Sequence, residues 1–247
     1  MWVKWHFQTL PLSKDCFCTL KLSIDENIRG RINSPSFIVK RYTVTKLYNI
    51  IMKNEFAFIL GNGKTRKKFL IKDLLRKGKV FACNRVYQES PSPHTLVSVD
   101  KDMAHEIQNS GYSAKNTHYT RESNVIKNSG ALGLHKKYFG YSSGPNCVAL
   151  AANEGFPYIF FIGMDLHSLD PNYINNLYAG EKFYKQKTDI PQIFNNWVKQ
   201  IQDIIKEFPN QRFVHVNPLL DFTPSAWTSL PNFSIMTSEE FRVMINN

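Results

Sequence analysis

Several features that would assign this 247-residue sequence to a class at once are missing from it. No apolar run reaches the roughly 18 residues that a membrane-spanning helix needs, and the N-terminus has neither the apolar stretch nor the small-residue cleavage site of a signal peptide. Cysteine is scarce, and the spacing of the four cysteines fits neither a zinc site nor a disulfide framework (Cys16, Cys18, Cys83 and Cys147). We therefore expect a cytoplasmic protein of a reducing compartment, with no membrane span and no bound metal.

Acidic residues are few beside the basic ones: 20 Asp and Glu stand against 31 Lys and Arg, a formal net charge of +11. Such an excess attracts anions, and nucleic acid, an anionic membrane surface and a phosphorylated small substrate all fit it. A solvated basic surface without a specific partner fits it equally well. The sequence has no RNP segment, helix-turn-helix signature or zinc finger, so no specific nucleic-acid partner is expected.

The first 51 residues differ from the rest. They carry eight basic and three acidic residues, about half of the net charge in a fifth of the chain, and no hydrophobic period persists in them. Two interpretations stay open. Residues 1–51 are either a basic extension that binds something anionic, or the product of a start assigned too early, with Met52 the natural first residue. We favour the second and predict a non-native or disordered extension followed by one domain over residues 52–247.

From residue 56 onward, short apolar runs alternate with amphipathic segments. Strands buried on both faces give such runs, here residues 56–60, 80–83, 95–99, 158–162 and 213–216. Helices are predicted after residue 63 (with Phe69, Leu70, Leu74 and Leu75 at helical spacing), through Met103 and Ile107, and over residues 147–154, 193–208 and 238–245. Residues 111–141 and 166–190 read as loops. The alternation predicts an α/β fold, a Rossmann-like, mostly parallel sheet with helices on both faces.

The predicted strands end in residues suited to a ligand site. In a parallel sheet, ligands bind beyond the carboxyl ends of the strands, near the switch in strand order; here residues 61–65, 163–165, Asn84 and Asp100 follow strands. Glycine allows a tight turn and close approach to a phosphate, and N–H groups of a following helix, capped by Thr65, would face the anion. The first loop matches neither the Gly-x-Gly-x-x-Gly nor the Walker pattern, and a plain turn is its alternative explanation. Asp100 would contact a ribose or a metal, or cap the next helix.

Four short motifs occur in an order that resembles a known family. They are Gly61-Asn62-Gly63 after the first strand, Cys83-Asn84-Arg85-Val86-Tyr87 after the second, Ser142-Ser143-Gly144 before a helix and Gly163-Met164-Asp165 after a later strand. This order resembles the bacterial CMP-sialic acid sialyltransferases of glycosyltransferase family 42. It is also similar to the related 6-hydroxymethylpterin diphosphokinase MptE-like family. The resemblance covers roughly residues 55–217 and implies a Rossmann-like nucleotide-binding core.

The resemblance also implies roles for individual residues. The nucleotide would be bound by Gly61, Asn62, Gly63, Thr65, Asn84, Ser143 and Gly144. Of two tyrosines that contact the leaving phosphate in the sialyltransferases, Tyr173 stands at one position and His167 replaces the other. The family's general-base histidine has no counterpart in residues 176–184. His167, whose unperturbed pKa of about 6.5 suits a base, and Asp165 are the substitutes, so the catalytic candidates are His167, Tyr173 and Asp165.

Three functions stay open. The leading hypothesis is a transferase that passes a sugar from a CMP-linked donor to an acceptor that the sequence does not name, with no cofactor. The second is a diphosphokinase that uses ATP and magnesium, with Asp100 and Asp165 as metal ligands. The third is a non-catalytic nucleotide- or nucleic-acid-binding protein, which the positive charge and the missing base histidine favour.

Other histidines and tyrosines are secondary candidates. The spacing of the histidines does not fit a metal site, and surface positions are predicted for His94, His105, His118 and His135. His215 lies in a predicted strand and is expected to be structural. Tyr178 and Tyr184 would face a substrate or only anchor their loop.

Overall fold

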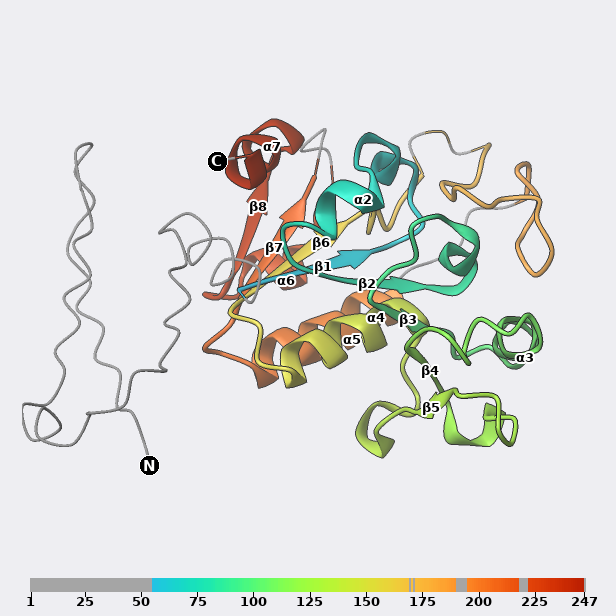
Figure 1. Cartoon of the computed structure of the whole chain (residues 1–247). Coiled ribbons are helices and arrows are strands. Elements are labelled where there is room, and N and C mark those ends of the chain that lie inside the picture. The colour runs from blue at the N-terminus through green and yellow to red at the C-terminus, as the bar shows by residue number, and fades with distance from the viewer. Residues whose placement is uncertain (1–54, 169, 171, 190–194, 218–221, 247) are drawn as a thin grey trace, which may run out of the picture. The chain divides into compact units, whose positions relative to one another are not determined.

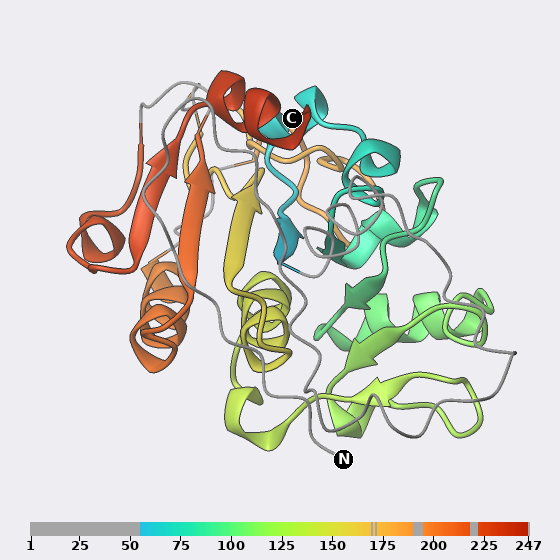
Figure 2. The same cartoon turned by 60° about the vertical axis from the view of Figure 1, so that its left-hand side comes forward.

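The computed structural model describes residues 55–168, 170, 172–189, 195–217 and 222–246 (Figure 1). Residues 1–51 and Met52 lie outside these ranges, so neither interpretation of the extension is tested by the structure. Within them the chain forms an eight-stranded sheet of order β5-β4-β3-β2-β1-β6-β7-β8, in which every pair of neighbours is parallel. The strands β6, β7 and β8 run side by side in the same direction (Figure 2).

The elements follow one another as strands and helices. The strands are β1 (Phe56–Leu60), β2 (Lys79–Cys83), β3 (Thr95–Val97), β4 (His118–Thr120), β5 (Leu132–Gly133), β6 (Tyr158–Ile162), β7 (Arg212–Val216) and β8 (Phe233–Met236). The α-helices are α2 (Ile71–Leu74), α3 (Lys101–Asn109), α4 (Ser143–Asn153), α5 (Asn195–Glu207), α6 (Ser225–Thr228) and α7 (Ser238–Asn246). Short 3-10 helices are η2 (Lys64–Lys68), η3 (Asn84–Gln88), η4 (Glu122–Asn124) and η5 (Lys136–Tyr138).

The central strands are apolar because both of their faces are covered. Alternate residues of β1 enter two separate cores: Ala57 and Ile59 pack with α4, α5 and α6, whereas Phe58 and Leu60 pack with α2, α3 and α7. Figure 1 shows α4 and α5 on one side of the sheet and α2 and α7 on the other. Burying each large side chain fully contributes roughly 1.5–3 kcal/mol. The predicted Rossmann-like sheet with helices on both faces is therefore confirmed.

The strand order reverses between β1 and β6. From β1 the chain builds the sheet outward through β2, β3, β4 and β5, then returns to place β6 on the other side of β1 and continues to β7 and β8. The loops after β1 and β6 therefore diverge from a common point at the carboxyl edge of the sheet. This is the position at which sheets of this kind bind ligands.

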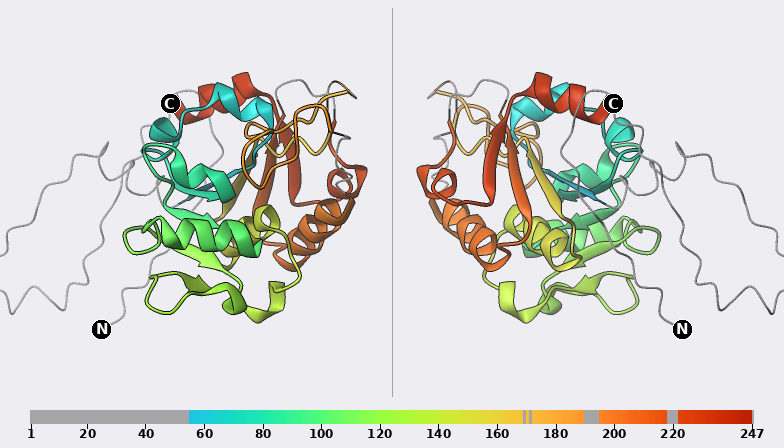
Figure 3. Two further views of the ribbon diagram at one scale, coloured as in Figure 1. Left: turned by 90° about the vertical axis from the view of Figure 1, so that its right-hand side faces the viewer. Right: turned by 90° about the vertical axis from the view of Figure 1, so that its left-hand side faces the viewer.

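The segment after β1 differs from the predicted long helix. It forms the 3-10 helix η2 and then the single turn α2, and Leu70, expected on a buried face, is 55% exposed. Phe69 instead packs edge-on against Phe241 of α7, with ring centroids 5.3 Å apart, and both segments lie together in Figure 3. The start of η2 is shaped by hydrogen bonds to residues about 100 positions away, a constraint that local spacing does not reveal.

Three strands were not predicted. The stretch read as loops over residues 111–141 contains β4 and β5, and β8 follows the strand taken as the last firm one. All three lie toward the two edges of the sheet. Edge strands need not be apolar on both faces: β5 is exposed, and Ser234 and Ile235 of β8 are exposed. No continuous apolar run marks such strands.

The prediction that His118 lies on the surface is wrong, because this residue is fully buried in β4. Its Nε2 lies 2.8 Å from Ser98 Oγ and its Nδ1 lies 2.8 Å from Ser113 Oγ. Burial lowers the pKa of His118 to about 4. His94 and His135 are exposed and His105 is partly exposed, whereas His215 is buried in β7 as expected.

No helix in the described ranges is long and apolar enough to cross a membrane. Two of the four cysteines lie in these ranges, Cys83 and Cys147, and both are buried free thiols. Burial raises the pKa of Cys83 to about 12, so the sulfur stays protonated and unreactive at neutral pH. Cys16 and Cys18 lie outside the described residues.

The buried histidine predicts a pH dependence of stability. The pKa of His118 in the folded chain, about 4, lies below its unfolded value of about 6.5, so the unfolded chain binds more protons between these values. The free energy of unfolding should therefore fall by about 3 kcal/mol as the pH drops from about 6.5 to 4. Urea unfolding at a series of pH values measures this. The slope should flatten above pH 4.5 in His118→Gln and persist in the control His105→Gln; an unchanged slope in His118→Gln would contradict it.

Candidate functional site

A cleft of about 720 Å³ opens at the carboxyl edge of the sheet. Its walls come from the loops after β1, β2, β3, β4 and β6, from the first turn of α4, from α5 and from the long connection after β6. The motif residues and other site candidates that line it are Gly61, Asn62, Gly63, Cys83, Asn84, Asp100, Ser142, Ser143, Gly144, Gly163, Met164, Asp165 and Tyr184. Thr65, His167, Tyr173 and Tyr178 are not part of this lining. The structure thus brings the four motifs together in one cavity.

The loops after β1 and β6 touch through their backbones. Gly61 N–H donates to the carbonyl of Ile162 (2.9 Å), and Gly63 N–H donates to the carbonyl of Gly163 (2.8 Å). A Cβ on Gly61 would lie 2.7 Å from the carbonyl carbon of Gly163, and one on Gly63 would lie 2.7 Å from its oxygen. Gly163 itself has a φ of +71°, which L residues rarely adopt. These glycines are required by the contact between the two loops.

Four N–H groups of the first loop bond within the protein. Besides those of Gly61 and Gly63, the N–H of Lys64 donates to Asn175 Oδ1 (2.8 Å), and that of Thr65 donates to Asp165 Oδ2 (3.2 Å). The expectation that these groups face a phosphate does not fit this geometry. Thr65 also does not cap the helix, because Gly63 occupies the N-cap position of η2 and no side chain makes the capping bond.

Asp165 joins three parts of the cleft. Its buried carboxylate accepts hydrogen bonds from the hydroxyl and N–H groups of Thr65 and from Asn175 Nδ2 (3.0 Å). Asn175 Nδ2 also donates to the backbone carbonyl of His167 (2.9 Å). Both oxygens of Asp165 are therefore engaged in holding loops. Asn175 lines the cleft but stands in a long connection without a motif, and no sequence signal marked it.

Asn84 and Ser143 form a polar pair at the end of β2. Asn84 has a φ of +53°, a left-handed conformation that asparagine tolerates better than most residues. Its Oδ1 accepts from Ser143 Oγ (3.1 Å), and the same hydroxyl accepts from the N–H of Val99 (3.1 Å). The first turn of α4, with Ser143 and Gly144, lines the cleft. N–H groups of a first turn have no acceptor within their helix, so this wall favours negative charge.

Asn62 contributes a buried acceptor without a partner. Its Nδ2 donates to Tyr184 Oη (3.3 Å), whereas its Oδ1 is buried and accepts no hydrogen bond from the described residues. Tyr184 Oη also accepts from the N–H of Arg85 (3.4 Å). Burial raises the pKa of Tyr184 well above its usual range, so its hydroxyl stays protonated. A buried carbonyl oxygen of this kind is rare in proteins and suits a hydrogen-bond donor on a ligand.

Two buried arginines hold the long connection after β6 in place, and this connection forms the outer wall of the cleft. Arg66 makes a bidentate pair with Glu89 (3.1 and 2.7 Å) and donates to Tyr178 Oη (2.9 Å), which also bonds to Glu89. Burial would raise the pKa of Glu89, but the bonds from Arg66 and Tyr178 outweigh it and lower that pKa. Tyr178 therefore anchors its loop rather than lining the cleft.

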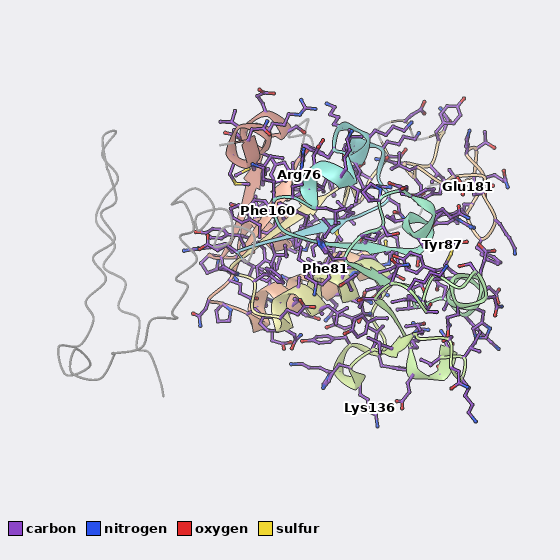
Figure 4. The ribbon with its side chains drawn as sticks, in the orientation of Figure 1. Arg76, Phe81, Tyr87, Lys136, Phe160 and Glu181 are labelled. Carbon is purple, nitrogen blue, oxygen red and sulfur yellow. The ribbon has the colours of Figure 1, made fainter. Side chains whose placement is uncertain are left out.

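The second arginine, Arg85, joins the same connection to α3. It pairs with Glu106 (2.5 Å), donates to the carbonyl of Lys182 (2.6 Å) and lies 3.4 Å from a carboxylate oxygen of Glu181. Its guanidinium carbon lies 5.9 Å from the ring of Tyr87, which Figure 4 shows on the same side of the molecule as Glu181. Ion pairs and hydrogen bonds of arginine thus hold the outer wall of the cleft at several points along its length.

His167 and Tyr173 lie outside the cleft. His167 Nδ1 lies 2.6 Å from the backbone carbonyl of Asp165, and its ring packs against Phe222 with centroids 5.1 Å apart. The ring of Tyr173 is exposed. Neither side chain lies beside Asn84 or Ser143 in the lining of the cleft. Their expected catalytic roles remain predictions.

Among the described residues, the acidic side chains of the cleft do not belong to a larger cluster of metal-ligating groups. The described residues contain no group of three or more His, Cys, Asp or Glu side chains that could hold a metal ion. Asp100 occupies the N-cap position of α3, yet its side chain makes no capping hydrogen bond. The capping explanation for Asp100 therefore does not fit. Its carboxylate lines the cleft instead, where a ribose or metal contact stays a prediction.

Similarity to known proteins is found at the level of structure. No protein-family model matches the chain, and no curated protein matches it. Among solved structures it is similar to the monofunctional α-2,3-sialyltransferase Cst-I from Campylobacter jejuni, with 14% sequence identity and a TM-score of 0.46. The match covers 65% of this chain and 75% of that chain. Nothing in these comparisons supports the diphosphokinase resemblance.

The backbone contact between the two loops predicts unequal effects of added methyl groups. In Gly63→Ala the new Cβ would collide with backbone and with the carboxylate of Asp165, so the free energy of unfolding should fall by about 1–3 kcal/mol. In the control Gly144→Ala the Cβ would meet Met164 Cε at an ordinary 3.5 Å, so stability should hold or rise. Urea unfolding of both variants measures this. Equal stability of the two variants would contradict the packing role of Gly63.

Proposed function

We propose that this chain is a nucleotide-dependent transferase that binds its nucleotide-activated donor in the cleft between the loops after β1 and β6. One observation carries the proposal: four motifs far apart in sequence meet in a single cavity at the reversal of strand order. A volume of about 720 Å³ lies within the range of small-molecule sites.

The polar groups of the cleft suit the parts of a nucleotide. The N–H groups at the start of α4 would face the phosphate, and Asn84, held by Ser143, would bond to the nucleotide. The buried Oδ1 of Asn62 would accept from a donor group of the ligand. Asp100 would accept from a ribose hydroxyl. Gly61, Gly63 and Thr65 would contribute by fixing the loop rather than through their N–H groups.

We propose further that the donor is a CMP-linked sugar, as the motif order resembles that of the sialyltransferases. The phosphate charge that develops as the sugar leaves would be stabilised by donors already in place. His167 is the proposed base. Its Nδ1 bond to the carbonyl of Asp165 implies that the neutral ring carries its proton on Nδ1, with Nε2 the basic nitrogen. Tyr173 would contact the phosphate, and Asp165 would act by positioning the loops.

A binding protein without catalysis is the second candidate, and one observation favours it. Asp165 is engaged in loop contacts, and neither His167 nor Tyr173 lines the cleft. The magnesium-dependent alternative is less well supported, because only Asp100 of its two proposed carboxylates is left to bind a metal. Release of CMP from a CMP-linked sugar, with the sugar passing to water or to an added hydroxyl compound, distinguishes a transferase, which releases CMP, from a binding protein, which does not.

The nucleotide site predicts a selective loss of binding in an Asn84 variant. Asn84→Gly removes the amide but keeps the left-handed backbone, so the affinity for CMP should fall at least about tenfold, or about 1.4 kcal/mol. Calorimetric titration of the full chain with CMP, CDP, UDP, GDP and ATP, with and without magnesium, measures this. The matched control is Asn128→Gly, an exposed asparagine with a φ of +63°, which should bind as the original chain does.

The outcomes of this titration separate the candidates. Metal-independent preference for CMP that is lost in Asn84→Gly supports the proposal. Binding of ATP that requires magnesium would replace it with the diphosphokinase hypothesis. If no nucleotide binds, both nucleotide hypotheses are wrong.

A further inference from the structure

Arg121 is a cleft residue that the sequence motifs do not include. It directly follows β4, so it lies at the carboxyl edge of the sheet, as do Asn84 after β2 and Asp100 beyond β3. Its side chain is partly buried and lines the cleft. The guanidinium carbon lies 5.6 Å from the centre of the Phe139 ring, in the segment that leads into α4. A cation is therefore held in the same cavity as the first turn of α4.

The partners of Arg121 differ from those of the two buried arginines. Arg66 and Arg85 each form an ion pair with a glutamate, Glu89 and Glu106. No carboxylate among the described residues lies within 4.0 Å of the Arg121 nitrogens. Its Nε is buried without a hydrogen-bond partner, as are those of Arg66 and Arg85, so the missing ion pair is what sets Arg121 apart. Burying a polar or charged group without such a partner is costly. Arg121 therefore brings to the cleft a positive charge that no described carboxylate pairs with directly, although Asp100 and Asp102 line the same cavity.

We propose that Arg121 is the anion-binding residue of the cleft and holds a phosphate or carboxylate of the ligand. The planar guanidinium binds either oxyanion through two parallel hydrogen bonds. The ring of Phe139 limits its freedom, and the first turn of α4 favours negative charge in the same cavity. The glycine loop cannot take this role through the N–H groups of Gly61 and Gly63, because these already bond to β6 and its loop.

This inference rests on the proposed function, since it names the residue that would hold the anionic group of the nucleotide-activated donor. The role of Arg121 can also be tested without any nucleotide. If Arg121 serves to bind an anion, it should lower or leave unchanged the stability of the folded chain without the anion, and it should raise that stability once the anion is bound. A residue kept for structure should show the opposite.

The test compares the thermal unfolding of four forms of the full chain: unsubstituted, Arg121→Met, Arg121→Lys and the control Arg76→Met, an exposed arginine paired with Asp73. Sodium chloride is replaced by sodium phosphate or by sodium acetate at constant ionic strength. We expect phosphate to raise the Tm of the unsubstituted chain and of Arg76→Met. Arg121→Met should lose most of this rise, while its Tm in chloride is equal or higher. Arg121→Lys should lose at least half of the rise.

The two anions distinguish the sources of the oxyanion. A rise with phosphate alone assigns a phosphate, and a rise with acetate as well assigns a carboxylate. If Arg121→Met and Arg121→Lys both respond to the anions as the unsubstituted chain does, the inference is wrong. Should Arg121→Met fail to fold, the anion response of Arg121→Lys decides.

A nucleotide titration of Arg121→Met separates this inference from the proposed function. We expect at least a tenfold loss of CMP affinity. Unchanged CMP affinity in this variant, with loss of binding in Asn84→Gly, would overturn the role of Arg121 and leave the nucleotide site standing. An Arg121-dependent phosphate response without binding of any nucleotide would overturn the proposed function and leave the anion site standing.

Discussion

The direct contact between the loops after β1 and β6 determines the rest of the cleft. Adjacent parallel strands lie about 4.8 Å apart, and side chains usually separate the loops that leave them. Here Gly61 and Gly63 bond directly to Ile162 and Gly163. Because no Cβ stands between the loops, Asp165 comes within reach of Thr65. The floor of the cleft is therefore set by backbone contact rather than by a bound group.

The outer wall depends on that floor through a chain of polar contacts. The carboxylate of Asp165 also accepts from Asn175, which in turn accepts from the N–H of Lys64, so the connection after β6 is tied to the loop after β1 at two points. Farther along, Arg66 and Arg85 tie the same connection to the loop after β2 and to α3. Buried ion pairs contribute little net stability, but removal of one partner lowers the stability strongly because the other charge is left buried and unpaired. Their main effect here is to give a long loop one defined position.

The sequence predicted the central strands of the sheet but not its outer strands. The apolar runs of β1 and β6 are visible because both faces of these strands are buried, and Asn84 and Asp165 were found because they follow such runs. The outer strands β4, β5 and β8 lack that signal. The environment of His118 depends on Ser98 and Ser113, and no periodicity reveals such a partner. Likewise, the sequence shows the N–H donors of the first loop but not their acceptors, which come from residues about 100 positions away.

One short motif, Gly61-Asn62-Gly63, shows how far a pattern alone can carry a functional argument. Its glycines are equally suited to a phosphate and to a neighbouring backbone, and the structure uses them for the backbone. The polar groups left to face a ligand are then side chains: the buried Oδ1 of Asn62, the amide of Asn84 and the guanidinium of Arg121. Groups of this kind distinguish ligands by their donors and acceptors, because a mismatched ligand leaves a buried polar atom unpaired. Such side chains would let the cleft distinguish between ligands in a way that backbone N–H groups alone would not.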